Sequence, residues 1–577
     1  MERHIQIGLA QLNPHVGSLP ANAATIVHAV RQLTETGADW VVLPELALCG
    51  YPPEDLLLKQ HFIDACRDSL QHVAAAIPPE TVVFCGFPQP APPHASDHRL
   101  AHNAAAVLHR GSIQAVYTKH RLPNYDVFDE KRLFRPGSTD PALTISGIRV
   151  AVHICEDSWF PQQESPLPGE AWEPEILINL SASPYHQGKW RQREAILSAT
   201  GKRMGCPVVY TNLVGGQDEL VFDGGSKVIT ADSTVLYRAP AFSESLAVVA
   251  VPIPERPRLH PAPDLPQITI DQKPQSSPIA SPPTQSEPPE PFDEVYQALV
   301  LGLGDYVRKN GFSGVLIALS GGIDSALAAS IAVDALGPDA VRTFTMPSQY
   351  SSDATLSDAV LLAQNMGIEI DTLPIRGLYD TFMNELAPVW DDADPGLAEE
   401  NLQARIRGTL IMTLSNKTGR MVVSTGNKSE LATGYCTLYG DMNGGFAVIK
   451  DVPKTLVFDL CRWRNDQSNS PWIPPSTIDR PPSAELRPDQ KDTDSLPDYD
   501  VLDGILVRYV EQDQGADDIV AAGFDPDTVR QVLRLVDRSE YKRRQSPPGV
   551  RITPKAFGRD HRVPITNGFS DSPPQDP

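Results

Sequence analysis

The chain has 577 residues, of which 41% are hydrophobic, so it can build several separate cores and is no small peptide, fibre or wholly disordered chain. Its 49 Lys and Arg against 72 Asp and Glu leave a formal charge of −23, which disfavours nucleic acids and anionic membranes as partners. No run approaches the ~20 apolar residues of a membrane span, and no secretion signal is recognisable at the start, so a cytoplasmic location is predicted.

Residues 1–252 alternate short apolar runs with helical patterns. Runs such as DWVVLPE and IRVAVHICED each lead into a turn, whereas ANAATIVHAVRQLTETGA has helical periodicity and Gly37 as its C-cap. This alternation predicts a layered α/β domain.

A proline-rich stretch follows at 253–292. The chain holds 55 prolines, about twice the usual share of ~5%, and many of them lie here among Ser and Gln. Such a composition favours an extended, polyproline-like linker. A second proline-rich insertion occupies 470–490, and the chain after Pro547, including a tail at 561–577, is expected to be weakly ordered.

The second domain, predicted at 293–560, opens with an amphipathic helix, a strand VLIALS, a glycine turn and another helix. A strand, a tight loop and a helix in this order predict a doubly wound parallel sheet. The loop contains Ser320, Gly321, Gly322, Asp324 and Ser325.

The glycines of this loop let the backbone approach an anion, and the following helix N-terminus offers free N–H groups. The loop lacks the lysine of a Walker P-loop and does not match GxGxxG. Asp324 inside a phosphate cradle implies a bridging cation, Mg2+. The alternative interpretation is an ordinary glycine turn capped by Asp and Ser. The strand before the loop and the helix after it favour the phosphate-binding interpretation.

SGGIDS resembles the pyrophosphatase loop of the N-type ATP pyrophosphatases, which cleave ATP between its α and β phosphates. With EENLQARIRG (399–408), the stretch 424–455 and EYKRRQSPPG (540–549), the domain is similar to NAD+ synthetases and to the adenine nucleotide alpha hydrolase fold. The resemblance implies that deamido-NAD+ contacts Asn401, Glu430 and Lys542. It also implies that ATP contacts the loop residues, Thr425 and Lys454, and that magnesium is held by Asp324 and Glu430.

Cys155 follows the predicted strand IRVAVHI, and two other strand ends carry Glu45 and Lys119. A carboxylate can take a thiol proton, and an ammonium can stabilise the thiolate and an oxyanion. An isolated cysteine is more often a buried core thiol. The seven cysteines show neither CxxC nor zinc spacing, so no disulfide framework or zinc site is predicted.

The sequences around these three residues resemble the nitrilase superfamily and its Glu-Lys-Cys triad, which implies an α-β-β-α layered domain. The family pattern makes Glu45 the general base, Lys119 the transition-state stabiliser and Cys155 the nucleophile. It also matches three glutamine-binding positions: Tyr125, Ser183 and Lys189. For Tyr125 and Ser183, packing or a turn hydrogen bond is the alternative.

Together the two halves resemble the glutamine-dependent NAD+ synthetases. The resemblance implies that ammonia from glutamine, carried through an interior tunnel, amidates adenylated deamido-NAD+, and that the protein forms homo-oligomers. Two features depart from the family pattern: Cys436 replaces a small residue near the nucleotide, and the proline-rich linker is expected to loosen coupling.

Three alternatives stay open. In the first alternative, the chain is a different amidotransferase that adenylates another acid. In the second alternative, one half of the chain is a non-catalytic scaffold or regulatory module. In the third alternative, the chain is a nitrilase-like amidase with an idle ATP domain.

Overall fold

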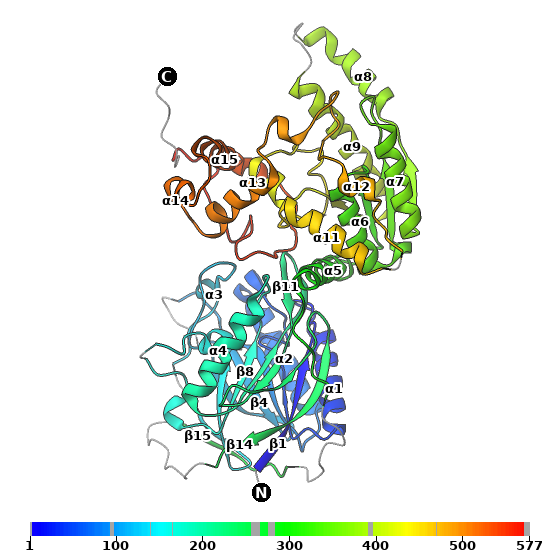
Figure 1. Ribbon diagram of the computed structural model, residues 1–577. Coiled ribbons are helices and arrows are strands. Elements are labelled where there is room, and N and C mark those ends of the chain that lie inside the picture. The colour runs from blue at the N-terminus through cyan, green and yellow to red at the C-terminus, as the bar shows by residue number, and fades with distance from the viewer. Residues whose placement is uncertain are drawn as a thin grey trace. The chain divides into compact units, whose positions relative to one another are not determined.

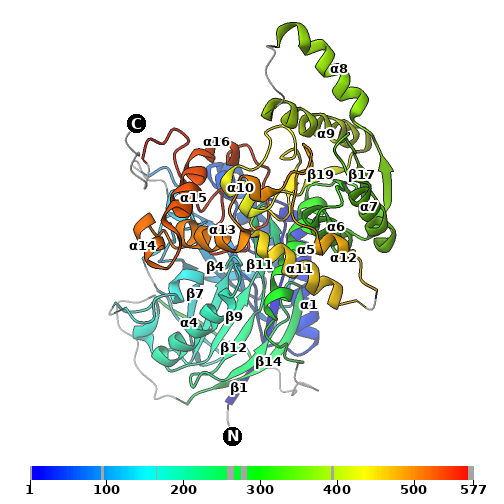
Figure 2. The ribbon, with the colours of Figure 1, turned by 45° about the horizontal axis from the view of Figure 1, so that its top comes forward.

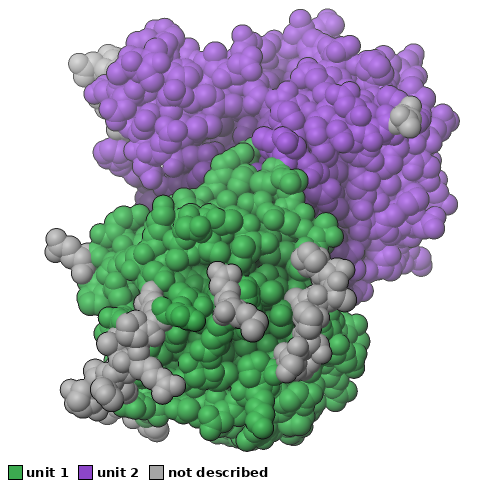
Figure 3. Space-filling model, turned by 60° about the horizontal axis from the view of Figure 1, so that its bottom comes forward, with its two compact units in different colours: residues 1–217, 221–289 green, residues 218–220, 290–577 purple. Residues whose placement is uncertain are grey.

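The structure is a computed structural model that describes residues 3–92, 97–138, 140–163, 165–255, 266–274, 283–390, 396–468 and 470–569. It divides into two compact units (Figure 3). Unit 1 comprises 1–217 and 221–289, and unit 2 comprises 218–220 and 290–577. The division at 289/290 lies inside the stretch predicted to be a linker.

Two sheets form the centre of unit 1. The first has the order β14-β1-β2-β3-β4-β5, with bounds β1 (Arg3–Gln11), β2 (Trp40–Val42), β3 (Val82–Pro90), β4 (Ala101–His109), β5 (Ser112–Thr118) and β14 (Ser245–Ile253). The second has the order β13-β12-β9-β8-β7-β6-β15, with bounds β6 (Ala142–Ile145), β7 (Ile148–Ile154), β8 (Ile176–Ser181), β9 (Val208–Asn212), β12 (Lys227–Ile229), β13 (Val235–Arg238) and β15 (Gln267–Ile270). A separate pair consists of β10 (Val214–Gln217) and β11 (Leu220–Asp223).

Strand β2 shows how these sheets form layers. Trp40 and Val42 join the core between the two sheets, whereas Val41 faces the helices outside the first sheet, because successive strand side chains point to opposite faces. Helices α1 (Leu19–Glu35) and α2 (Gln60–Ala76) cover that first sheet, and α4 (Lys189–Met204) covers the second (Figure 1). The predicted α-β-β-α architecture is confirmed.

Short helical turns connect these layers: η1 (Glu54–Leu58), α3 (Glu130–Leu133), η2 (Cys155–Ser158) and η3 (Glu170–Trp172).

Part of the stretch predicted to be a spacer is a strand. Residues Gln267–Ile270 form β15, which pairs in parallel with β6. Ile268 packs against the core between the sheets and Ile270 is 3% exposed, so the apolar residues alternate as in a half-buried strand. Residues 256–265 and 275–282 of the predicted linker lie outside the described part of the chain.

Unit 2 contains a five-stranded parallel sheet in the order β18-β17-β16-β19-β20. Its strands are β16 (Val315–Ala318), β17 (Val341–Thr345), β18 (Glu369–Thr372), β19 (Met421–Ser424) and β20 (Phe446–Ala447). Helices near the sheet are α5 (Pro291–Lys309), α6 (Ile323–Leu336), α7 (Asp353–Met366), α8 (Arg376–Leu386), α9 (Leu397–Thr418) and α11 (Lys454–Asp466).

Helices α5, α6, α7 and α11 pack together on one face of the sheet, and α9 packs on the other through Ile406 and Ile411 (Figure 2). The predicted doubly wound sheet is confirmed. The chain runs from β16 outward to β18 and then returns to β19 beside β16. Ligands of such sheets bind at the carboxyl ends of the strands where the direction reverses, which places a candidate site after β16 and β19.

A second, mainly helical part of unit 2 follows the sheet. Its elements are α10 (Lys428–Thr433), η6 (Asp492–Asp494), α13 (Tyr499–Leu506), the π-helical turn η7 (Val507–Glu511), α14 (Ala516–Ala521), α15 (Pro526–Arg538) and α16 (Glu540–Arg543). Three other short elements lie in the sheet region: η4 (Pro338–Ala340), η5 (Ala387–Val389) and α12 (Pro475–Asp479). Helices α10, α13, α14 and α15 and the turn η7 contribute to one core that includes Leu502, Val532 and Leu533.

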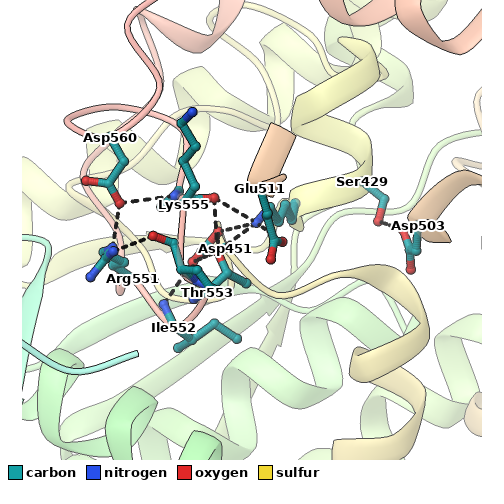
Figure 4. Close-up of polar contacts among 12 residues, drawn as sticks. Ser429, Asp451, Asp503, Glu511, Arg551, Ile552, Thr553, Lys555 and Asp560 are labelled. Atoms are coloured by element: carbon teal, nitrogen blue, oxygen red, sulfur yellow. Dashed lines mark hydrogen bonds and ion pairs between the residues drawn. The ribbon is translucent and has the colours of Figure 1, made fainter. Parts of the chain in front are cut away.

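The prediction of weak order after Pro547 is wrong for residues 548–560. Val550 and Ile552 are 1% and 0% exposed, and Arg551 forms a buried ion pair with Asp560 (Figure 4). The prolines suggested a loose tail, but the alternating apolar residues pack inward. Of the predicted tail 561–577, residues 570–577 lie outside the described part of the chain.

No helix among the described residues is both long enough and apolar enough to span a bilayer.

Candidate active sites

Three strand ends of unit 1 bring Glu45, Lys119 and Cys155 together. Glu45 lies in the turn after β2, Lys119 directly follows β5, and Cys155 directly follows β7. All three are buried, and Lys119 Nζ donates to Glu45 Oε1 at 2.8 Å. The charges of Glu45 and Lys119 both influence the pKa of the Cys155 thiol, so the three residues form one cluster.

Cys155 begins the turn η2 with a φ of 43°. This left-handed conformation is strained for a residue with a Cβ, and such strain concentrates at functional sites. Burial raises the pKa of the thiol well above its ordinary value, Glu45 raises it further, and Lys119 opposes the rise. The resting sulfur is therefore a protonated thiol that needs a base.

Glu45 is held by both of its carboxylate oxygens. Besides the bond from Lys119, Oε1 accepts a hydrogen bond from Asn103 Nδ2 at 2.7 Å, and Oε2 accepts one from the backbone N–H of Ala182 at 2.8 Å. These bonds fix the carboxylate toward the cluster and limit its rotation.

Glu130 is a fourth buried charge that the sequence reasoning missed. It lies on α3, and its Oε1 accepts hydrogen bonds from Lys119 Nζ and Tyr51 OH, each at 2.9 Å. Burial raises the pKa of Glu130 to about 7, Lys119 opposes that rise and Glu45 adds to it. For Lys119, burial favours the neutral amine, but Glu130 and Glu45 together hold its pKa well above the ordinary value.

The three predicted glutamine-binding residues lie near this cluster. Tyr125 OH donates to both carboxylate oxygens of Glu156, at 2.8 and 2.9 Å, and Lys189 acts on the same carboxylate. Ser183 directly follows Ala182 and is buried, and its hydroxyl has no hydrogen-bond partner within the described residues. A buried hydroxyl without a partner is a feature that a polar ligand can satisfy.

In unit 2, a cavity of about 330 Å3 opens at the carboxyl ends of β16 and β19. Its volume lies in the range of small-molecule sites. Eight of the predicted residues line it: Ser320, Gly321, Gly322, Asp324, Ser325, Thr425, Glu430 and Lys454.

In the loop after β16, the backbone at Gly321 packs closely against the backbone of Thr355. Gly321 has a φ of 83°, and a Cβ there would lie 2.1 Å from the carbonyl oxygen of Thr355, so only glycine fits. The hydroxyl of Ser325 donates to Gly322 O at 2.9 Å. The loop leads directly into α6, whose first N–H groups have no partner within the helix and attract anions.

Lys454 joins the two predicted metal ligands. Its Nζ forms a close ion pair with Asp324 and lies 3.3 Å from Glu430 Oε1. Burial raises the pKa of Glu430 to about 8, with Lys454 opposing the rise and Asp324 adding to it. The described residues contain no group of three His, Cys, Asp or Glu that would hold a metal alone. Two carboxylates completed by substrate phosphates are nevertheless a donor set that suits Mg2+.

The backbone around Lys454 is itself anchored. Asp503 accepts a hydrogen bond from the Ser429 hydroxyl (Figure 4). It also accepts one from the backbone N–H of Thr455 at 2.9 Å, and the Ser429 hydroxyl accepts the Lys454 N–H at 2.9 Å. These contacts tie α10, α11 and α13 together, so Glu430 and Lys454 are fixed relative to each other.

Asn401 and Lys542 do not line the cavity but hold one of its walls. Asn401 Oδ1 accepts from Thr437 Oγ1 at 2.7 Å, and Lys542 Nζ donates to the carbonyl oxygens of Gly434 and Cys436 at 2.6 and 2.8 Å. Cys436, noted as a departure from the family pattern, is half-buried and lines the cavity. The further lining residues that sequence reasoning missed include Arg407, Arg480 and Asp492.

The fold and the two sites together define a carbon–nitrogen hydrolase joined to an NAD synthase. The model of the carbon-nitrogen hydrolase family matches residues 6–256, and that of the NAD synthase family matches residues 295–546.

The chain belongs to the family of glutamine-dependent NAD(+) synthetases. It is 45% identical to the member from Synechocystis sp., over 98% of this chain and 99% of that protein, and 44% identical to the member from Acinetobacter baylyi with the same coverage. A solved structure of the synthetase from Acinetobacter baumannii in complex with ADP is 40% identical, with a TM-score of 0.73 over 99% of this chain and all of that one. A structure from Cytophaga hutchinsonii shares the fold at a TM-score of 0.79 and 21% identity, over 98% of each chain.

Proposed function

We propose that this chain makes NAD+ from deamido-NAD+, with glutamine as its nitrogen source. Unit 1 hydrolyses glutamine to glutamate and ammonia, and unit 2 uses ATP to adenylate the nicotinate carboxylate and then amidates it, releasing AMP and pyrophosphate. The observation that carries this proposal is one chain holding both a buried Cys155-Glu45-Lys119 cluster and a glycine-loop cavity with Asp324 and Lys454.

In unit 1, Glu45 takes the proton of the Cys155 thiol as the sulfur attacks the side-chain carbonyl carbon of glutamine. Lys119 offsets the negative charge that develops on the carbonyl oxygen. The proton passes to the leaving nitrogen, ammonia departs, and a γ-glutamyl thioester remains. Water then attacks the thioester with Glu45 as its base, which releases glutamate and restores the thiol.

Glutamine is a zwitterion, so its site needs groups for both charges as well as for the amide. We assign its binding to Tyr125, Ser183 and Lys189. Their support is the ammonium of Lys189 near Glu156 and the unpartnered hydroxyl of Ser183 among the described residues.

In unit 2, the loop residues together with Thr425 and Lys454 bind the phosphates of ATP. Asp324 and Glu430 would hold Mg2+ together with those phosphates, and the bound ion would offset the charge on the triphosphate. Glu430, Asn401 and Lys542 are assigned to deamido-NAD+. Because Asn401 and Lys542 brace the 434–437 wall in this structure, their contribution to binding includes shaping that wall.

We further assign the enzyme to the cytoplasm and to a homo-oligomeric state. The strongly acidic charge and the family resemblance support these assignments. Fractionation of the cell tests the first, and light scattering of the purified protein tests the second.

The test supplies deamido-NAD+, ATP and Mg2+ with either glutamine or ammonium, and follows NAD+, AMP and pyrophosphate for wild type, Cys155→Ala and Asp324→Asn. Cys155→Ala is expected to lose NAD+ formation from glutamine and keep it from ammonium. Asp324→Asn is expected to lose both while still hydrolysing glutamine. Wild type that makes no NAD+ from either nitrogen source would overturn the proposal and favour another adenylated acid.

A further inference from the structure

Asp157 is a fully buried carboxylate that the chemistry proposed above does not use. It lies in η2, two residues after the nucleophile, and it is 0% exposed. Four donors bind it: Oδ2 accepts from the Ile154 N–H at 3.0 Å and Tyr117 OH at 2.8 Å, while Oδ1 accepts from two further backbone N–H groups at 3.1 and 2.9 Å, those of His120 and Arg121.

These donors come from the segments that carry two of the three reacting groups, Lys119 and Cys155. Ile154 directly precedes Cys155, and His120 directly follows Lys119. The carboxylate of Asp157 therefore ties the turn that bears the thiol to the backbone that bears the ammonium.

The strain at Cys155 makes such a tie necessary. A non-glycine residue with a φ of 43° persists only where its surroundings over-determine the conformation. The Ile154 N–H bond to Asp157 closes the turn across the strained residue. Charge-assisted hydrogen bonds that a carboxylate accepts from backbone N–H groups are also among the stronger hydrogen bonds in proteins.

We infer that Asp157 is a positioning residue for glutamine hydrolysis: it holds Cys155 in its strained turn and in register with Lys119. This inference rests on the proposed function of unit 1. A displacement of about 1 Å in a catalytic group can lower a rate about 100-fold, so loss of the tie is expected to affect the chemical step more than substrate binding.

Asp157→Asn tests this with little change in volume. The remaining carbonyl oxygen can still accept the His120 and Arg121 N–H groups, but the new NH2 group then faces the Ile154 N–H, donor against donor. The bond across Cys155 is lost. The expected result is a fall in kcat for glutamine hydrolysis of about 100-fold, with KM for glutamine nearly unchanged and NAD+ formation from ammonium at the wild-type rate.

Alkylation of Cys155 by iodoacetamide gives a second readout that needs no turnover. Its rate against pH is expected to change in Asp157→Asn, because the sulfur no longer sits at its place between Glu45 and Lys119. If wild type fails to hydrolyse glutamine, the proposed function fails, and the alkylation profile alone decides whether Asp157 positions the thiol. An unchanged profile and an unchanged kcat would overturn the inference.

Tyr117→Phe is the milder matched variant, since it removes one donor to Oδ2 and keeps the charge and the Ile154 bond. It is expected to lower kcat less than Asp157→Asn, again with KM unchanged. If unit 1 of Asp157→Asn unfolds in a melting experiment and Tyr117→Phe keeps the wild-type kcat, Asp157 is a purely structural residue and the inference is wrong. A rise in KM that matches the loss of kcat/KM would overturn it as well.

Discussion

Lys119 shares its ammonium between two buried carboxylates, Glu45 and Glu130. Among the described residues, Glu45 has two more partners, the amide of Asn103 and the Ala182 N–H, which hold it in the thiol cluster. The negative charge of Glu130 therefore helps to keep Lys119 protonated, so that Glu45, the base, is not the sole counter-ion of the ammonium.

Replacing Glu130 by Gln removes that second charge and tightens the pairing of Lys119 with Glu45, which makes Glu45 a weaker base. We expect kcat for glutamine hydrolysis to fall by at least about tenfold. In wild type, a carboxyl with a pKa near 7 is ionised above that pH, so kcat is expected to fall as the pH drops below 7. In Glu130→Gln this part of the pH profile is expected to disappear.

Kinetics of glutamine hydrolysis between pH 5.5 and 8.5 would check this, with Tyr51→Phe as the control. Tyr51 donates to the same oxygen of Glu130, so its loss leaves both charges in place. A Glu130→Gln variant with the wild-type pH profile would contradict the role given to Glu130.

At the residue scale, the sequence was informative where function concentrates in a short segment. The loop Ser320–Ser325 could be recognised because the glycines and hydroxyls expected of a phosphate-binding loop lie within six neighbouring positions. Glu130 and Asp157 carry no such signal, since most of their partners come from segments distant in the sequence and meet them only in the folded chain. Lys542 lay in a recognisable motif, but its ammonium contacts carbonyl oxygens of the cavity wall, which no motif reveals.

Among the elements, the last segment of unit 2 depends on one carboxylate. Asp451 Oδ2 accepts the backbone N–H groups of Ile552 and Thr553, each at 2.8 Å, and Oδ1 lies 3.0 Å from Lys428 Nζ (Figure 4). Lys428 directly follows the N-cap of α10, the helix that carries Glu430. The segment 548–560 is thereby part of the scaffold beneath the nucleotide cavity.

Asp451→Asn is expected to destabilise unit 2 by about 3–5 kcal/mol, because it breaks a buried ion pair and leaves an amide facing a backbone donor. Urea unfolding monitored for unit 2 measures this. The control is Asp513→Asn, which breaks the exposed pair of Asp513 with Lys555 and is expected to change stability by at most about 1 kcal/mol. Equal effects of the two substitutions would refute the importance of the buried network.

His561 directly follows the same segment, with its ring 5.3 Å from that of Phe557. Burial, with a further contribution from Arg543, lowers the pKa of His561 to about 4. The unfolded chain binds this proton near pH 6.5, whereas the native chain does not. Native stability is therefore expected to fall as the pH drops from about 6.5 to about 4.

His561→Gln removes this titration, so its Tm is expected to drop less than that of wild type between pH 7 and pH 5. His61→Gln, an exposed position on α2, is the control and should behave like wild type. If both variants lose Tm as wild type does, His561 does not contribute to the acid sensitivity of the fold.

The types of the long elements could be predicted from periodicity, but two pieces of ordered chain could not. Both β15 and residues 548–560 are short apolar alternations, Ile268 with Ile270 and Val550 with Ile552, surrounded by prolines. A high density of prolines indicates only that regular structure is locally unfavourable. It does not show whether a segment distant in the sequence supplies a packing or pairing partner. In each case the partner, β6 or Asp451, lies more than a hundred residues away.

At the scale of the whole molecule, each unit has its own core, since unit 1 is built around the contacts between its two sheets and unit 2 around its parallel sheet and helical part. We expect calorimetry to resolve two transitions. ATP with Mg2+ at about 100 times Kd is expected to stabilise only the transition of unit 2, by about 2.7 kcal/mol.

Asp324→Asn should abolish that shift and leave the other transition where it is. Alkylation of Cys155 should move the unit 1 transition alone. A single transition that responds to both ligands would show that the units unfold as one cooperative body.

Strand β1 pairs with β14 along its whole length, from Arg3 with Ile253 to Gln11 with Ser245. During synthesis on the ribosome, β1 is therefore made well before the strand that pairs with it. At about 5–20 residues per second, β14 follows β1 by roughly 10–50 s. During that interval one edge of β1 has no strand to pair with, and an open, apolar strand edge invites association with other chains. The nascent chain therefore has a defined period in which a chaperone that shields strand edges would raise the yield of folded protein.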